Sequence, residues 1–362
     1  MAEPYPTFSW EEQHELELRV SPFYTEYLEK PVELRHRALV LLRAQHVAFL
    51  KRGLRNLSES HRVLDASRPW LCYWAMHGLC LLGEEIPEDV ASDVVAFLAL
   101  CQDPEGGYGG GPKQIAHLAS TYAAVCTLLT LGTDKAFASM NRESMLRFIL
   151  RMKVPLSDPV YGGGFRMHPT GEVDIRGTYT AIAVAEMLDI KTEEVMEGVG
   201  DFVARSQTYE GGMGGEPGTE AHGGYAFCGL ATHIMLGCKT GLDIHKLARW
   251  AVFRQGSVEG GFMGRTNKLV DGCYSFWMGG LFPLLRRLLP PLDLEGLAAL
   301  LPAEGQQGGT RLVEDEVEEV QGSKILGSTD IFARVWPAAS LGEACTSESD
   351  DEECPPLIPP GR

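Results

Sequence analysis

Apolar residues follow two alternating patterns along the chain. Five segments are apolar on nearly every helical face, and they span residues 70–83, 120–132, 178–188, 224–237 and 274–285. Three segments between them carry one apolar face and one polar face, at residues 86–102, 141–153 and 243–255. A helix that is apolar all round is buried all round, whereas an amphipathic helix covers a core with one face. The alternation therefore predicts an all-α fold of inner and outer helices.

The five apolar segments belong to a repeat of about fifty residues. A glycine pair and a polar loop precede each of the last four, as in EGGMGGEPGTEAHGGY. The tyrosines that mark the repeat are Tyr73, Tyr122, Tyr179, Tyr225 and Tyr274. A period of this length is typical of stacked or ringed helical hairpins, so we predict an α/α barrel. We expect the barrel to span residues 31–290, after an N-terminal extension of residues 1–30.

Charge is concentrated at one end of the chain. Of a net charge of −17, residues 291–362 carry −11, from 15 acidic and 4 basic residues. Stretches such as VEDEVEEV and SESDDEE predict a disordered acidic tail in this region. The overall negative charge argues against nucleic acid as a partner. No run is long and apolar enough for a membrane span, and nine scattered cysteines favour reduced thiols in the cytoplasm.

Residues 265–277, RTNKLVDGCYSFW, concentrate three kinds of chemistry. Arg265 and Lys268 suit an anion, Asp271 and Cys273 suit a soft metal ion, and three aromatic residues suit an apolar ligand. The positions three residues before each repeat tyrosine are Trp70, Ala119, Arg176, His222 and Asp271. If these positions are equivalent, they meet at the N-terminal ends of the inner helices, which favour anions. A basic mouth above an aromatic interior predicts a phosphorylated lipid as the ligand.

Each of these residues also has a simpler interpretation. Asp271 is typical of a helix cap, and a cysteine such as Cys273 is more often a small buried residue than a ligand. His222 could be a core histidine, and Arg265 and Lys268 could belong to a solvated loop. An Asp-x-Cys pair is also a weak metal motif. Their convergence on one mouth is what favours a site.

Four stretches resemble a known family: EAHGGYAFCG, GRTNKLVDGCYSFW, SRPWLCYW and GEVDIRGTY. They are similar to the β subunits of protein prenyltransferases, most closely those of farnesyltransferases. The resemblance implies an α/α barrel that pairs with an α subunit. It also implies farnesyl transfer from farnesyl diphosphate to the cysteine of a C-terminal Cys-aliphatic-aliphatic-X (CaaX) sequence.

The resemblance implies roles for individual residues. The diphosphate would contact His222, Gly223, Gly224, Tyr225, Arg265, Lys268 and Tyr274. The prenyl chain and the acceptor peptide would lie against Trp70, Trp74, Arg176, Tyr179 and Trp277. The bulk of Trp70 favours a farnesyl over a geranylgeranyl chain, although a geranylgeranyltransferase β subunit is the alternative. A triterpene cyclase is disfavoured because no Asp-x-Asp-Asp motif occurs in the barrel.

The resemblance also implies two metal ions. Asp271 and Cys273 would bind one zinc ion (Zn²⁺), which lowers the pKa of the acceptor thiol, and magnesium (Mg²⁺) would assist the diphosphate. The family's third zinc ligand is a histidine preceded by a tyrosine, yet this sequence has no histidine after His245. We also find five inner helices where the family has six. The sequence therefore predicts weak zinc binding, and a catalytically impaired binding protein for the α subunit or prenyl diphosphate is the second hypothesis.

Overall fold

The structure, a computed structural model, describes residues 7–289. It divides into a unit of Met1–Phe282 and a second unit of Pro283–Arg362. The expected acidic tail at residues 291–362 lies outside the described residues. Within the described part the chain forms helices and no β-strand, with only isolated β-bridges in the loops. No helix there is long and apolar enough to cross a membrane.

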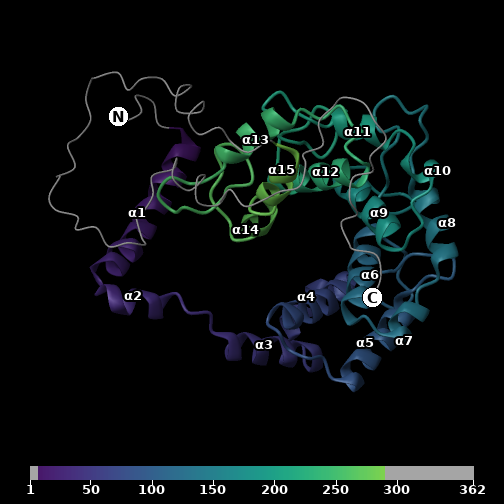
Figure 1. The fold of residues 1–362 in the computed structure, drawn as a ribbon, viewed down its shortest axis with the longest axis horizontal. Helices are drawn as coiled ribbons and strands as arrows, with labels where there is room; N and C mark the ends of the chain where they lie inside the picture. Colours follow the sequence, from purple (N-terminus) through teal and green to yellow (C-terminus); the bar gives the residue numbers. More distant parts are fainter. Residues whose placement is uncertain (1–6, 290–362) are drawn as a thin grey trace. The chain divides into compact units, whose positions relative to one another are not determined.

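Four inner helices lie side by side in chain order, each in contact with the next (Figure 1). They are α4 (Arg68–Leu81), α6 (Leu118–Leu131), α9 (Ile175–Met187) and α12 (Gly223–Met235). Met76, Val125, Ile182 and Leu230, one from each helix, have no exposed surface. The prediction of helices buried on nearly every side is confirmed for α6, α9 and α12, whereas α4 exposes Trp74 and Leu81.

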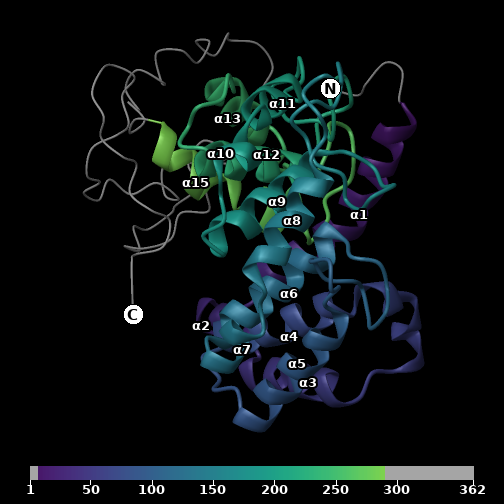
Figure 2. The same ribbon diagram turned by 90° about the vertical axis from the view of Figure 1, so that its right-hand side faces the viewer.

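Amphipathic outer helices accompany the inner ones. Contacts join α5 to α6, α8 to α9 and α11 to α12, and Figure 2 shows α8 and α9 together. Asn141 and Asp243 cap two outer helices, because their side chains accept the N–H groups of Ser144 and Lys246. The outer helices are α5 (Glu88–Cys101), α8 (Arg142–Met152), α11 (Val199–Arg205) and α13 (Ile244–Val252).

Several helices were not predicted from the pattern. The first three, which precede the inner helices, bury few side chains, and α1 and α3 bury none. The others are short connectors between the long helices, except for α11, which is an outer helix. The unpredicted elements are α1 (Phe8–Glu29), α2 (Val32–Ala38), α3 (Arg43–Arg55), the 3₁₀ helix η1 (Glu59–Ser67), α7 (Asp134–Ala138), α10 (Glu193–Met196) and α11.

The fifth inner helix differs from the prediction. A single helix was expected over residues 274–285, but α14 (Tyr274–Trp277) stops after one turn and α15 (Leu281–Leu288) follows. Gly279 and Gly280 lie in the gap, and the Gly279 N–H donates to the carbonyl of Tyr274, five residues back. Two consecutive glycines favour such a break because glycine loses more conformational entropy in a helix than other residues do.

Candidate functional site

Four side chains mark equivalent starts of the inner repeats. His117, Asp174, His222 and Asp271 each accept the backbone N–H two residues ahead, at 3.1, 2.7, 3.0 and 2.8 Å. The Asp271 carboxylate thus binds a backbone N–H of its turn, although the N-cap of α14 itself is Cys273. The equivalence of Trp70, Ala119 and Arg176 with His222 and Asp271 is wrong, because Ala119 and Arg176 supply the capped N–H groups and do not cap.

The same register corrects the choice of repeat tyrosines. Counting five residues on from each capping residue gives Tyr122, Tyr179, Phe227 and Phe276. Successive members of this series are in ring contact, at centroid distances of 5.5, 6.0 and 5.1 Å. Tyr225 and Tyr274 lie two positions earlier in their repeats. They are therefore not equivalent to Tyr122 and Tyr179, and they do not belong to this series of ring contacts.

The first N–H group of each inner helix is already engaged by the following repeat. These bonds are 2.8 to 2.9 Å long and run from Arg68 to the carbonyl of Gly110, Leu118 to Met167, Ile175 to Gly215 and Gly223 to Gly264. The capping side chains occupy a second N–H group in three of these helices. Side chains, more than open helix ends, must therefore supply the attraction for an anion at this mouth.

A cavity of about 560 Å³ opens beside α9 and α12 and collects predicted site residues. Its charged and aromatic lining comprises Arg176, His222, Tyr225 and Arg265 together with Glu172, Asp174, Glu216 and Glu220. The mouth was expected to be basic, and the structure corrects this because four carboxylates line the same cavity. Arg265 lies 3.1 Å from Glu220, and the Arg176 Nε lies 3.0 Å from Asp174.

His222 joins two of the predicted site tyrosines. Its Nδ1 accepts the Gly224 N–H, so the neutral ring carries its proton on Nε2 and donates it to the Tyr274 hydroxyl at 2.9 Å. Burial lowers the pKa of His222, and the charge of Arg265 lowers it further. The Tyr274 hydroxyl hydrogen is then free to donate to a ligand. His222 is half-buried at a cavity, so it is not a core histidine.

Arg176, predicted to lie beside the prenyl chain, and the remaining predicted diphosphate ligands differ in position. The Arg176 guanidinium lies 5.7 Å from the ring centre of Tyr225, and its pKa is raised mainly by the hydrogen bond to Asp174. Lys268 is exposed and does not line the cavity. Gly223 and Gly224 contribute backbone only, to the bond with Gly264 and to the cap on His222.

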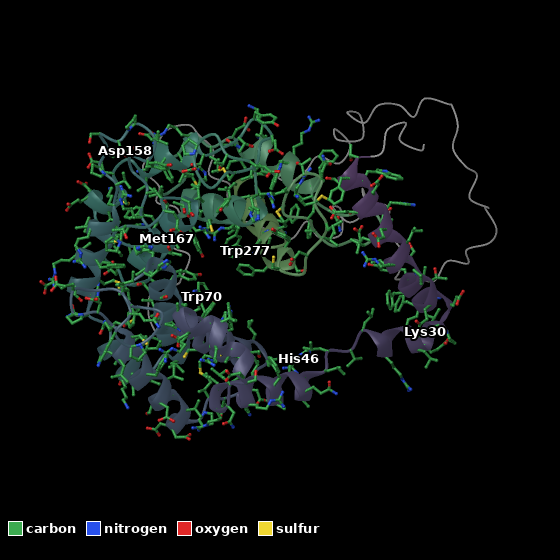
Figure 3. The ribbon with its side chains drawn as sticks, turned by 180° about the vertical axis from the view of Figure 1, so that it is seen from behind. Lys30, His46, Trp70, Asp158, Met167 and Trp277 are labelled. Atoms are coloured by element: carbon green, nitrogen blue, oxygen red, sulfur yellow. The ribbon has the colours of Figure 1, made fainter. Side chains whose placement is uncertain are left out.

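Aromatic side chains form a continuous wall across the inner helices. In Figure 3, Trp70 and Trp277 lie toward the middle of the view, whereas Asp158 lies at its outer edge. The ring contacts run Trp74–Trp70, Trp70–Tyr122, Tyr122–Tyr179, Tyr179–Phe227 and Phe227–Trp277, all at 5.5 to 6.0 Å. Tyr122 and Phe227 were missed as wall residues, although the five-residue spacing from the caps would have identified both. The Tyr122 and Tyr179 hydroxyls are also hydrogen-bonded, at 3.0 Å.

Asp271 and Cys273 are adjacent and exposed. The Asp271 carboxylate accepts the Cys273 N–H at 2.8 Å, which lowers the pKa of Asp271. Partial burial, then the hydrogen bond to Asp271, raises the pKa of the Cys273 thiol to about 11. The interpretation of Cys273 as a buried residue is wrong. Across residues 7–289 no group of three or more His, Cys, Asp or Glu side chains is arranged to hold a metal ion.

Comparison with known proteins relates the chain to prenyltransferases. The prenyltransferase alpha-alpha toroid domain matches residues 41–325. Protein farnesyltransferase subunit beta of Arabidopsis thaliana is 50% identical over 79% of this chain and 58% of its own length. The Pisum sativum subunit is 58% identical over 62% of this chain and 52% of its own length. The chain thus spans somewhat over half the length of these curated relatives.

A solved structure gives the same fold. The protein geranylgeranyltransferase-I of Candida albicans, complexed with GGPP, superposes with a TM-score of 0.59 at 21% identity. The superposition covers 74% of this chain and 83% of that one. The matched region, residues 41–325, runs past the boundary expected at residue 290.

Proposed function

Because this chain belongs to the prenyltransferase alpha-alpha toroid family, we propose that it acts as the β subunit of a protein farnesyltransferase. The observation that carries the proposal is that α9 and α12 supply residues both to the aromatic wall and to a cavity that holds two arginines. A ligand with a long apolar chain and an anionic head matches both parts. Farnesyl diphosphate has this chemistry, and two relatives named as farnesyltransferase β subunits support the choice.

The side chains of the cavity have distinct tasks in this proposal. The guanidinium of Arg265 and the hydroxyl of Tyr274 donate to the diphosphate and stabilise the charge that develops as it leaves. His222 holds the Tyr274 oxygen from the other side, so that the hydroxyl hydrogen points away from the imidazole. Arg176 and Tyr225 complete the rim of the cavity. Lys268 lies three residues after Arg265 in the same loop, and its charge attracts the diphosphate at long range.

The aromatic wall binds the isoprenoid and limits its length. Burying apolar surface contributes about 25 cal/mol per Å², so a farnesyl chain supplies much of the binding free energy. The Trp70 indole packs against Tyr122 and Trp74 at one end of the wall. Its bulk leaves less room for a fourth isoprene unit, which favours farnesyl over geranylgeranyl diphosphate.

Zinc fits this chain only in part. Asp271 and Cys273 would supply two ligands, but a catalytic zinc takes three protein ligands, and the described residues hold no third beside them. The residues between 7 and 289 therefore do not complete a zinc site, and the roles proposed above rest on the chain's own side chains. Magnesium at the diphosphate stays a prediction. The second candidate is a binding protein for prenyl diphosphate or for the α subunit.

We expect the chain to work in the cytoplasm as a heterodimer with an α subunit, and to modify proteins that end in CaaX sequences. The test is single-turnover transfer from labelled farnesyl diphosphate to a CaaX peptide, with an α subunit and excess zinc. Labelled peptide, and none with serine in place of its cysteine, supports the transferase. Tight diphosphate binding without transfer supports the binding protein instead.

A further inference from the structure

Arg254 is a buried cation at a position that other repeats fill differently. Its equivalents are Cys101, Met152 and Ser206, and each of the four backbone carbonyls accepts the first hydrogen bond from its glycine-rich loop. The bonds come from Gly109 to Cys101 at 2.9 Å, Arg166 to Met152 at 2.8 Å, Gly214 to Ser206 at 2.9 Å and Met263 to Arg254 at 2.8 Å. All four residues are buried, and Arg254 is only 8% exposed. The fold therefore does not require a charge at this position.

The Arg254 side chain begins a relay of directed hydrogen bonds. Its Nη1 donates to the Thr266 hydroxyl oxygen at 2.6 Å, and that hydroxyl donates to Glu210 Oε2 at 2.8 Å. The other oxygen of Glu210 accepts the Ala221 N–H at 3.3 Å. Because a guanidinium only donates, the threonine hydroxyl is left to donate onward to the carboxylate. The relay thus ties the loop after α13 to the loop before α12.

Both ends of the relay adjoin residues of the cavity. Thr266 follows Arg265 directly, and Ala221 lies between Glu220 and His222. The exposed Arg265–Glu220 pair joins the same two loops a second time, but such exposed pairs hold geometry weakly. The part-buried relay is therefore the stronger constraint on where Arg265 and His222 lie.

Burial of the Arg254 guanidinium lowers the stability of the folded state. It lies 5.3 Å from the Trp250 ring centre, and within the described residues its Nε has no hydrogen-bond partner. Desolvation lowers the pKa of Arg254, and the charge of Glu210 opposes that shift. Replacing a whole buried ion pair with apolar residues is often neutral or stabilising, whereas removing one partner leaves the other charge uncompensated and destabilises the fold.

We propose that Arg254 is a positioning residue, which fixes the loops of Arg265 and His222 at the spacing that a diphosphate requires. The inference rests on the proposed function, since it assigns the relay to the same anion site. Loss of the guanidinium would therefore lower anion affinity even in protein that remains folded.

The test compares Arg254→Met, which installs the residue of the equivalent position Met152, with the unmodified full chain bound to its α subunit. At a temperature where denaturation curves show both proteins fully folded, we expect roughly tenfold weaker binding of pyrophosphate and farnesyl diphosphate, the scale of one charge-assisted hydrogen bond. Thr266→Val should weaken binding similarly, and the double variant should lose no more than either single variant. Arg205→Met, at an exposed arginine that bonds the Gly162 carbonyl, is the matched control and should leave affinity unchanged.

Amide hydrogen exchange at the two loops tests, without a ligand, whether the relay holds them together. Arg254→Met should speed amide exchange at residues 219–223 and 264–268 and leave α6 unchanged. Unchanged exchange there, or unchanged affinity for both ligands, would overturn the role of Arg254. If the unmodified chain binds neither ligand, the proposed function fails, and the exchange result alone then decides whether the relay couples the loops.

Discussion

Glu220 and a bound diphosphate should compete for Arg265. The Arg265 Nη1 lies 3.1 Å from Glu220 Oε2, and the two side chains are 42% and 51% exposed. A pair this exposed contributes about 0.2–1 kcal/mol. Removing the Glu220 charge therefore raises the affinity for farnesyl diphosphate by up to about fivefold. Arg265→Ala removes a hydrogen bond to a charged group, which costs about 1.5–3 kcal/mol or ~10- to 150-fold in affinity.

Calorimetric titration of Glu220→Gln, Arg265→Ala and the double variant with farnesyl diphosphate measures this competition. Glu216→Gln is the matched control, because Glu216 lines the same cavity and has no ion pair with Arg265. It should give a smaller gain, which high salt should remove. In the Arg265→Ala background the Glu220→Gln gain should shrink toward that of the control. Equal gains from Glu216→Gln and Glu220→Gln, or a loss of affinity in Glu220→Gln, would refute direct competition.

Three further predictions concern chain length, metal content and acid stability. Trp70→Thr should admit geranylgeranyl diphosphate markedly better, and unchanged competition kinetics between the two diphosphates would remove Trp70 from the end of the wall. The chain of residues 1–362 should bind less than one zinc per heterodimer, and Cys273→Ser should lower the metal content further; one tightly held zinc in the unaltered chain would contradict this. Burial lowers the pKa of His117, His222 and His233, so the folded state binds fewer protons than the unfolded state below about pH 6.5. Unfolding midpoints should therefore fall as pH drops below that value, and less so in His233→Gln.

The helices that carry the wall could be predicted because a helix buried on nearly all sides is apolar on nearly every face, and this pattern is visible in the sequence. Which residues of the successive repeats are equivalent was harder to predict from the sequence. Tyr225 has the residue type of Tyr122 and Tyr179, yet only the cap at His222 reveals that Phe227 is their equivalent. A residue's type repeats by chance more easily than a capping geometry does. The break of the fifth inner helix is visible in Gly279 and Gly280, once their cost in a helix is weighed.

Long-range polar pairing was beyond the sequence. Arg265 and Glu220 lie 45 positions apart, and Thr266 and Glu210 lie 56 apart. No local pattern links such residues, since the folded loops alone bring them together. The four carboxylates of the cavity were missed for the same reason, although two of them neighbour predicted site residues in the sequence.

The most direct measurement of the central claim is the affinity of the heterodimer for three ligands: farnesyl diphosphate, pyrophosphate and farnesol. If one site joins the arginine-lined cavity to the aromatic wall, farnesyl diphosphate should bind far more tightly than either of its parts. Phe227→Ala should weaken the binding of farnesyl diphosphate and farnesol but not of pyrophosphate, because Phe227 is in ring contact with Tyr179, Phe276 and Trp277 and does not line the cavity. Equal affinities for pyrophosphate and farnesyl diphosphate would contradict the claim, because the aromatic wall would then bind no part of the ligand.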